Sequence, residues 1–197
     1  MFLKWRRKSR LSALVLIGLG GLVFAAAQWQ PEAVAKPGPL GRVVYDPSSG
    51  SYFEIIRNKN NKWAGTWPVA RAAVNKRIYK GIRGRLAVVK TRATHNFLRK
   101  NLGIPFDAWI GLRYHCSTRK LVWVTGETLR RGVDLEVWHR QFYYEGRNVC
   151  NVGSTTTYLV VFYMGMERKG MKGSRLYWRI SGPNHALIGA LIEYPTR

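Results

Sequence analysis

The N-terminal 27 residues place the strongest constraint on what this chain can fold into. Residues 1–10 contain five cations and no acid, and residues 11–27 contain no charged side chain. A positive segment followed by an apolar stretch is typical of an export signal. At about 1.5 Å per residue, a helix over residues 11–27 would span roughly 25 Å, close to the thickness of a bilayer core. We therefore predict that residues 1–27 form a signal peptide or a signal-anchor transmembrane helix, and we favour the uncleaved anchor.

Either form places the rest of the chain outside the cytoplasm, because the basic flank of such a segment stays inside. The expected location is therefore a bacterial-type cell envelope, either on the inner membrane facing the periplasm or exported after cleavage. Residues 28–41 contain three prolines and two glycines, which favours an extended, semi-rigid linker. One folded domain is expected over residues 42–197.

The expected domain is strongly basic. The chain has 33 Lys and Arg against 10 Asp and Glu. Five of these cations and none of the acids lie in residues 1–27, so residues 28–197 keep a formal charge of +18. Such a surface attracts anionic partners. Nucleic acid is not expected among them, because the domain is predicted to be exported.

Two helices are expected in the first half of the domain. The first begins at Trp67, with Thr66 as its N-cap, and ends before Gly81. Its buried stripe is expected at Ala70, Val74 and Ile78. The second helix begins after Thr91 and ends at Gly103, and its buried face is expected at Ala93, Phe97, Leu98 and Leu102.

Strands are predicted at residues 86–89, 108–114, 121–125, 158–164, 175–180 and 186–194. Helices that come early and strands that come later are typical of the α+β class. Residues 127–157 are polar and aromatic without a clear period, which favours a long surface loop.

Several segments in this order resemble a C-type lectin-like domain over residues 41–194. Residues 108–112, AWIGL, are similar to the signature WIGL strand of that family, and residues 121–127, LVWVTGE, are similar to the segment that follows it. Tyr177-Trp178 and residues 190–194 resemble the closing pair of strands. The resemblance implies two helices and a short mixed, mostly antiparallel sheet with a long loop. On physical grounds alone, Trp109, Leu112 and Trp123 are expected in the core, with Gly111 allowing a close backbone approach.

The chain lacks the two calcium-binding triplets that the resemblance would lead one to look for. Sugar-binding members of the family hold calcium through a proline-containing triplet in the long loop and a Trp-Asn-Asp triplet in a later strand. No proline occurs between Pro105 and Pro183, and Arg179 follows Trp178. We therefore expect no cofactor and calcium-independent binding. A structural calcium held by the loop acids is the less favoured alternative; these acids are Glu127, Asp134, Glu136 and Glu145.

The chain has two cysteines, Cys116 and Cys150. In an oxidising compartment they could form a disulfide, and the alternative is two buried free thiols. No histidine, serine or cysteine stands in a recognised catalytic arrangement, so an enzyme is not expected. An enzymatic alternative, by distant likeness to sulfatase-modifying enzymes, would need reactive cysteines.

Cations interleaved with aromatic residues are the remaining functional signal. Arginine side chains bind carboxylate, phosphate or sulfate, and aromatic faces stack on sugar rings. The candidate ligand-binding residues lie in the long loop and in a following glycine-rich connection: Arg130, Arg131, Trp138, His139, Arg140, Tyr143, Tyr144, Arg147, Lys169, Lys172 and Arg175.

We therefore predict a membrane-anchored or exported lectin-like binding protein for a glycan or another anionic polymer. The alternative is a non-catalytic structural subunit of an envelope membrane complex, whose cations would meet an acidic membrane-protein partner.

Overall fold

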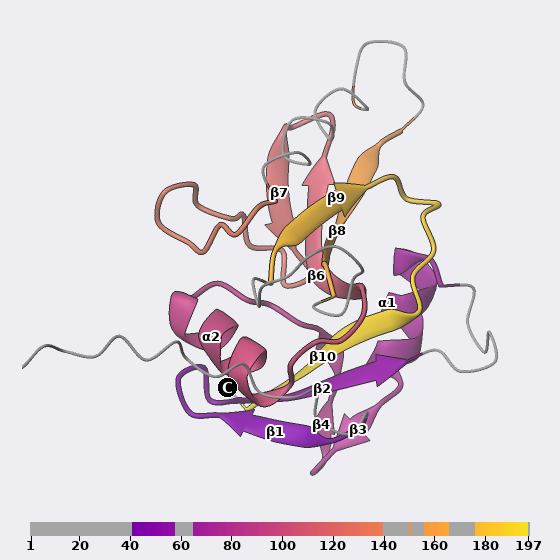
Figure 1. Cartoon of the computed structure of the whole chain (residues 1–197). Helices are drawn as coiled ribbons and strands as arrows, with labels where there is room; N and C mark the ends of the chain where they lie inside the picture. The colour runs from indigo at the N-terminus through magenta and orange to yellow at the C-terminus, as the bar shows by residue number, and fades with distance from the viewer. Residues whose placement is uncertain (1–40, 58–64, 140–149, 151–155, 166–175, 197) are drawn as a thin grey trace, which may run out of the picture. The chain divides into compact units, whose positions relative to one another are not determined.

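A computed structural model describes residues 41–57, 65–139, 150, 156–165 and 176–196 (Figure 1). All of them belong to one compact unit, residues 33–197. The predicted signal or anchor over residues 1–27 and nearly all of the predicted linker lie outside the described residues. No helix in the described ranges is both long enough and apolar enough to cross a bilayer.

Eight of the ten described strands form a mixed, mostly antiparallel sheet. Its main order is β1 (Val43–Asp46), β2 (Ser51–Arg57), β10 (Gly189–Pro195), β6 (Ala108–His115), β8 (Tyr158–Tyr163) and β9 (Trp178–Ser181). Two further strands pair at its sides: β5 (Arg85–Leu86) with β10, and β7 (Lys120–Trp123) with β6. Only the β10–β6 pair is parallel among these. Together with two helices, this confirms the predicted α+β class and mixed sheet.

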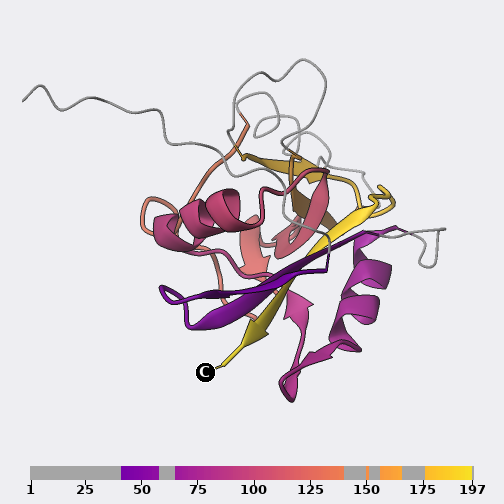
Figure 2. The ribbon, with the colours of Figure 1, turned by 60° about the horizontal axis from the view of Figure 1, so that its bottom comes forward.

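The helices α1 (Trp67–Asn75) and α2 (Arg92–Asn101) pack on opposite faces of β2 and β10 (Figure 2). Alternation along these strands explains why. Leu191 joins Phe53 and Ile55 in the apolar cluster that contains α2, whereas its neighbours Ala190 and Ile192 join the cluster that contains α1. Successive side chains of a strand point to opposite faces, so both faces of β10 are apolar and both need a covering layer.

The first predicted helix is shorter than expected. It ends at Asn75, and Ile78 is 66% exposed rather than buried in the helix stripe. Residues 78–83 instead form a hairpin of β3 (Ile78–Tyr79) and β4 (Ile82–Arg83). Lys80 and Gly81 make its turn with φ of 49° and 77°. Gly81 therefore marks a hairpin turn, which needs the left-handed conformation, and not a helix end.

The second helix was predicted more accurately. The Thr91 hydroxyl oxygen accepts a hydrogen bond from the Thr94 backbone N–H, as an N-cap does. Leu98 and Leu102 are buried as predicted, but Ala93 is exposed and Phe97 is half-buried. Thr94 and His95 take the buried positions instead. Polar residues occupy this face because His95 finds a buried partner, at 3.0 Å between its Nδ1 and the Tyr163 hydroxyl.

The later strands appear as β6 to β10 close to the predicted ranges, but the β1–β2 hairpin was not predicted. Asp46 organises its turn. One carboxylate oxygen accepts hydrogen bonds from the Ser48 backbone N–H and hydroxyl, and the other accepts one from the Ser49 hydroxyl. The hairpin adds β2 beside the closing strand β10, with seven paired residues.

Two buried glutamates fasten segments to the two faces of the sheet. On the α1 face, the Glu54 carboxylate accepts hydrogen bonds from Arg77 Nη2 and the Tyr194 hydroxyl, both at 2.6 Å. Burial and the bond to Glu54 raise the pKa of Tyr194 to about 12. On the other face, Glu193 accepts two hydrogen bonds from Arg85 and others from the Ser51 hydroxyl and the Val88 backbone N–H. Each buried charge is thus paired and hydrogen-bonded.

Gly111 provides the close backbone approach expected from the sequence. Its N–H donates to the Ala87 carbonyl at 2.9 Å, and its carbonyl accepts from the Val124 N–H at 2.7 Å. A Cβ on Gly111 would lie 2.6 Å from the Leu86 carbonyl oxygen. Trp109, Leu112 and Trp123 surround this crossing point and are each 1% exposed or less, as predicted.

We expect Gly111→Ala to destabilise the domain by about 3 kcal/mol, because backbone cannot move aside as a side chain can. For a domain of this size that equals a fall in Tm of roughly 6–12 °C. Thermal unfolding followed by circular dichroism measures it. The control is Gly182→Ala, where an added Cβ meets nothing within 4 Å. An unchanged Tm for Gly111→Ala would refute the close approach.

The domain should also lose stability in acid through His95. Burial lowers the pKa of His95 to about 4, with smaller contributions from Arg92 and Arg99. The unfolded chain therefore binds a proton that the folded chain resists, and stability present above about pH 6.5 is lost as the pH falls towards 4. We expect this residue to account for about 3 kcal/mol by pH 4.

Urea unfolding at pH 7 and pH 4.5 tests this expectation. His95→Gln should flatten the acid-induced loss relative to the unsubstituted chain, whatever its effect at pH 7. Parallel pH profiles for the two proteins would show that another group controls acid sensitivity.

Candidate functional site

The described part of the long loop pairs its cations with its own acids. Arg130 donates two side-chain hydrogen bonds to Asp134, and its backbone N–H donates a third. These bonds lower the pKa of the Asp134 carboxyl. The Arg131 Nε lies 3.9 Å from the Glu136 Oε2. Arg130 and Arg131, the two predicted binding arginines in this described segment, therefore pair with acids of the same loop.

Trp138 and His139 lie together against β9. The Trp138 indole N–H donates to Glu136, and its ring meets Trp178 edge-on with centroids 5.5 Å apart. His139 packs on Tyr177 and its backbone N–H donates to the Trp178 carbonyl. Both side chains are half-buried, so they secure the loop to the sheet.

The other predicted binding residues lie outside the described residues: Arg140, Tyr143, Tyr144, Arg147, Lys169, Lys172 and Arg175. Glu145, one of the acids considered for calcium, does too. Glu127 accepts hydrogen bonds from Lys90 and Thr125. Within the described ranges, no three His, Cys, Asp or Glu side chains gather as a metal site requires.

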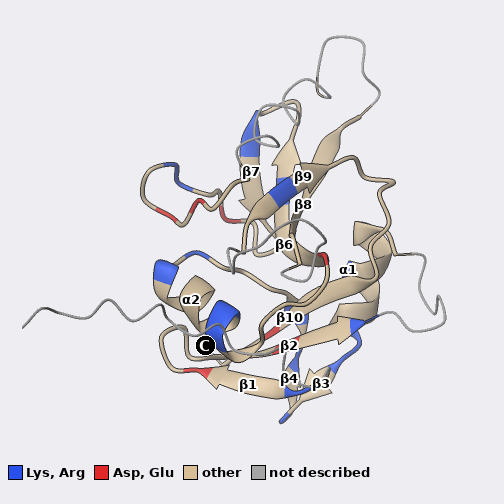
Figure 3. Cartoon of the chain, viewed as in Figure 1, with Lys and Arg blue, Asp and Glu red and all other residues tan. Residues whose placement is uncertain are grey.

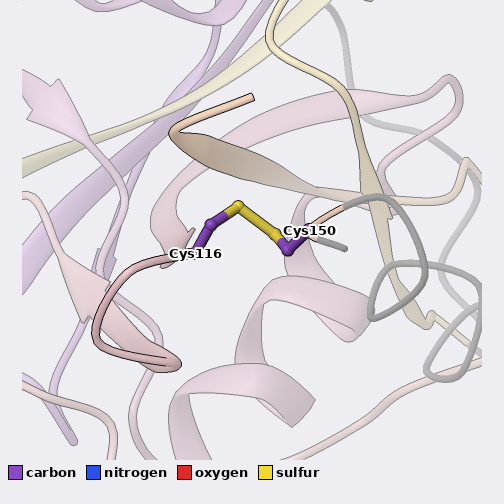
Figure 4. The surroundings of a disulfide bond; sticks show 2 residues. All are labelled: Cys116 and Cys150. Atoms are coloured by element: carbon purple, nitrogen blue, oxygen red, sulfur yellow. A yellow bond between two sulfur atoms is a disulfide. The ribbon is translucent and has the colours of Figure 1, made fainter. Parts of the chain in front are cut away.

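Cys116 and Cys150 form a disulfide, with their Cα atoms 5.3 Å apart (Figure 4). Of the two states left open by the sequence, the structure has the bridged one. The bond joins the end of β6 to the far end of the long loop, 34 residues later. Neither cysteine is a free thiol in this structure.

An arginine-lined groove lies along one side of α1. Trp67, Arg71 and Asn75 are spaced by four residues and therefore share one face of the helix. With Arg113 of β6 and Tyr158 of β8 they line a cavity of about 280 Å³. The Trp67 indole N–H donates to the Ile110 carbonyl at 2.7 Å, which fixes the ring and leaves its face to the arginines.

Arg113 is the most constrained cation of this groove. Its Cζ lies 4.9 Å from the centroid of the Trp67 ring and 5.4 Å from that of Tyr158. The Cζ of Arg71 lies 5.7 Å from the Trp67 ring as well. Two guanidinium groups therefore share one indole, an arrangement in which each is attracted to the ring and repelled by the other.

Burial and mutual repulsion both act against the charges of this pair. Burial lowers the pKa of Arg113, and the charge of Arg71 lowers it further. The Arg113 Nε is buried without a hydrogen-bond partner, and no described carboxylate pairs with either guanidinium. By contrast, Arg77 and Arg85 each hold a buried glutamate. Figure 3 shows how few acids accompany the cations that follow α1 into β3 and β4.

A second groove continues the first. It has a volume of about 290 Å³, shares Arg71 and Asn75 with the first groove, and is otherwise lined by Arg83, Gly84, Arg85, Val124 and Thr125. No Asp or Glu lines either groove. We call the two together the α1 groove.

The α1 groove was not predicted from the sequence. Its signal was the four-residue spacing of Trp67, Arg71 and Asn75, which places Arg71 and Asn75 along the edge of the apolar stripe of the helix. Arg113 could not be added from the sequence, because its strand meets α1 only in the folded domain.

Comparison with known proteins does not assign the chain to a family. No family model matches it. The sequence is 29% identical over 90 residues to Halomucin of Haloquadratum walsbyi; the match covers 45% of this chain, which spans about 1% of that protein's length. Among solved structures it is similar to the C-type lectin CEL-I of Cucumaria echinata, with a TM-score of 0.47, 14% identity, and coverage of 84% of this chain and 96% of that one. Neither likeness transfers a ligand to this chain.

Reducing the disulfide should lower stability by about 3.5–4 kcal/mol, the loop-entropy value for a separation of this length. Cys116→Ser with Cys150→Ser should show the same loss without reductant. Urea unfolding measures both. Equal stability of oxidised and reduced protein would mean that the bridge constrains the unfolded chain less than its length implies.

Proposed function

We propose that this chain is a non-enzymatic, calcium-independent binding protein for an acidic glycan, which it recognises through the α1 groove, and that residues 1–27 export or anchor it. The supporting observation is the pair Arg71 and Arg113 on one indole ring, without a described carboxylate.

An anion is the ligand that this pair needs. A carboxylate or sulfate between the two guanidinium groups would accept hydrogen bonds from both and remove their mutual repulsion. Arginine presents a planar fork of donors that suits such oxyanions. Folding of the domain already places the two guanidinium groups side by side. A ligand therefore does not have to supply the free energy of bringing them together.

A sugar is favoured over a simple anion by the neutral groups beside the arginines. The Asn75 amide and the Tyr158 hydroxyl line the same cavity and make no hydrogen bond with described residues. They can form hydrogen bonds with the hydroxyl groups of a sugar, while the arginines bind its acidic group. A cavity of about 280 Å³ is slightly smaller than the roughly 300 Å³ at which drug-sized ligand pockets begin, and suits one sugar ring.

The lining of the groove supports calcium-independent binding. Calcium takes six to eight oxygen ligands, usually several of them carboxylates, and the groove is lined by arginines with no acid. The predicted loop residues remain a second candidate surface, since most of them lie outside the described residues.

Binding of polygalacturonate to the exported domain tests the proposal, with neutral dextran as the reference polymer. We expect binding to survive a calcium chelator and to weaken with salt. Arg71→Ala and Arg113→Ala should each raise the Kd about tenfold or more, because each removes a charge-assisted hydrogen bond.

Two controls separate the groove from general basicity and from the loop. Arg92→Ala with Lys100→Ala removes two exposed charges of α2, on the other face of the sheet, and should change the Kd little. Arg130→Ala removes a loop cation and should also have little effect. A large loss in either control, or binding abolished by the chelator, would contradict the proposal as stated.

A further inference from the structure

We infer that the acidic glycan is a linear polymer with charges on successive sugars, which occupies both halves of the α1 groove at once. This inference rests on the proposed function and names the class of ligand. The chain's sugar units would follow the helix face from Arg113 past Arg71 towards Arg83.

The adjacency of the two cavities is the first argument. Arg71 and Asn75 line both, so the two cavities adjoin along these side chains. Each has nearly the same volume, about 280 and 290 Å³. Two equal compartments that share their dividing residues suit a ligand of repeated units better than a single small anion.

The distribution of charge is the second argument. In the second cavity, Arg85 donates hydrogen bonds from Nε and Nη2 to the Glu193 carboxylate, at 3.0 and 2.9 Å, so its charge is already balanced. Arg83 is exposed and has no carboxylate partner among the described residues. Each cavity therefore holds one unbalanced arginine of its own, Arg113 or Arg83, and the two share Arg71.

The far end of the second cavity also has a boundary. The Thr125 hydroxyl that lines it donates to Glu127, which also accepts a hydrogen bond from Lys90. Glu127 is paired with Lys90, and among the described residues no unpaired cation beyond Arg83 lines this end of the cavity, so a further anionic unit would gain no partner there. The groove thus offers two neighbouring anion positions followed by a stop, which predicts a short preferred length.

Defined oligogalacturonates test this inference. We expect the Kd to fall about tenfold from the monomer to the tetramer, beyond the statistical gain of repeated units, and then to level off. Arg83→Ala should raise the Kd of the tetramer about fivefold and leave that of the monomer unchanged, whereas Arg113→Ala should weaken both. Malto-oligosaccharides of equal length are the neutral reference.

The outcomes separate the two proposals. A Kd independent of length, or Arg83→Ala acting on the monomer and the tetramer alike, would overturn the polymer inference and leave the anionic groove intact. Absence of binding to every uronate would overturn the proposed function itself. Equal affinity for single-stranded oligothymidylate of the same charge would show that the groove recognises charge without sugar, and would overturn the inference.

Discussion

The position of β10 at the centre of the sheet is the constraint on which the rest of this domain depends. It pairs with β2, β5 and β6, which come from three separate parts of the chain. Its side chains supply both apolar clusters, and its Glu193 holds Arg85 and the Val88 backbone. Neither helix layer can form its core until this last strand is in place. Folding is therefore expected to be dominated by non-local pairing.

This central strand also helps to hold α1 in place on the sheet. Helix α1 packs in the apolar cluster that contains Ala190, Ile192 and Tyr194. Arg77, just beyond the helix, is tied through Glu54 to the hydroxyl of Tyr194. The N-terminal end of α1 is held by the hydrogen bond from the Trp67 indole N–H to the Ile110 carbonyl of β6. Because both ends are fixed to the sheet, the outward face of α1 presents Arg71 and Asn75 at a set distance from Arg113.

The sequence predicted those features that local patterns determine. Strand alternation placed Trp109, Leu112 and Trp123 in the core, and the N-cap at Thr91 placed the start of α2. The end of α1 was misjudged because Gly81 can end a helix or form a hairpin turn, and only the folded domain, with β3 paired to β4, distinguishes the two. The site could not be predicted as a whole, because it joins a helix face to Arg113 and Tyr158, which lie far along the chain.

The loop cations and the groove cations differ in how far their charge is balanced within the domain. Arg130 and Arg131 have acids within six residues and pair with them, so the charge of this loop segment is largely balanced within the loop. Neither Arg71 nor Arg113 pairs with a described carboxylate, and both pack against Trp67 in a partly buried place. A fold selected only for stability would place a glutamate beside them, as it does beside Arg77 and Arg85. Retaining two unbalanced guanidinium groups there is the arrangement that an external anion would explain.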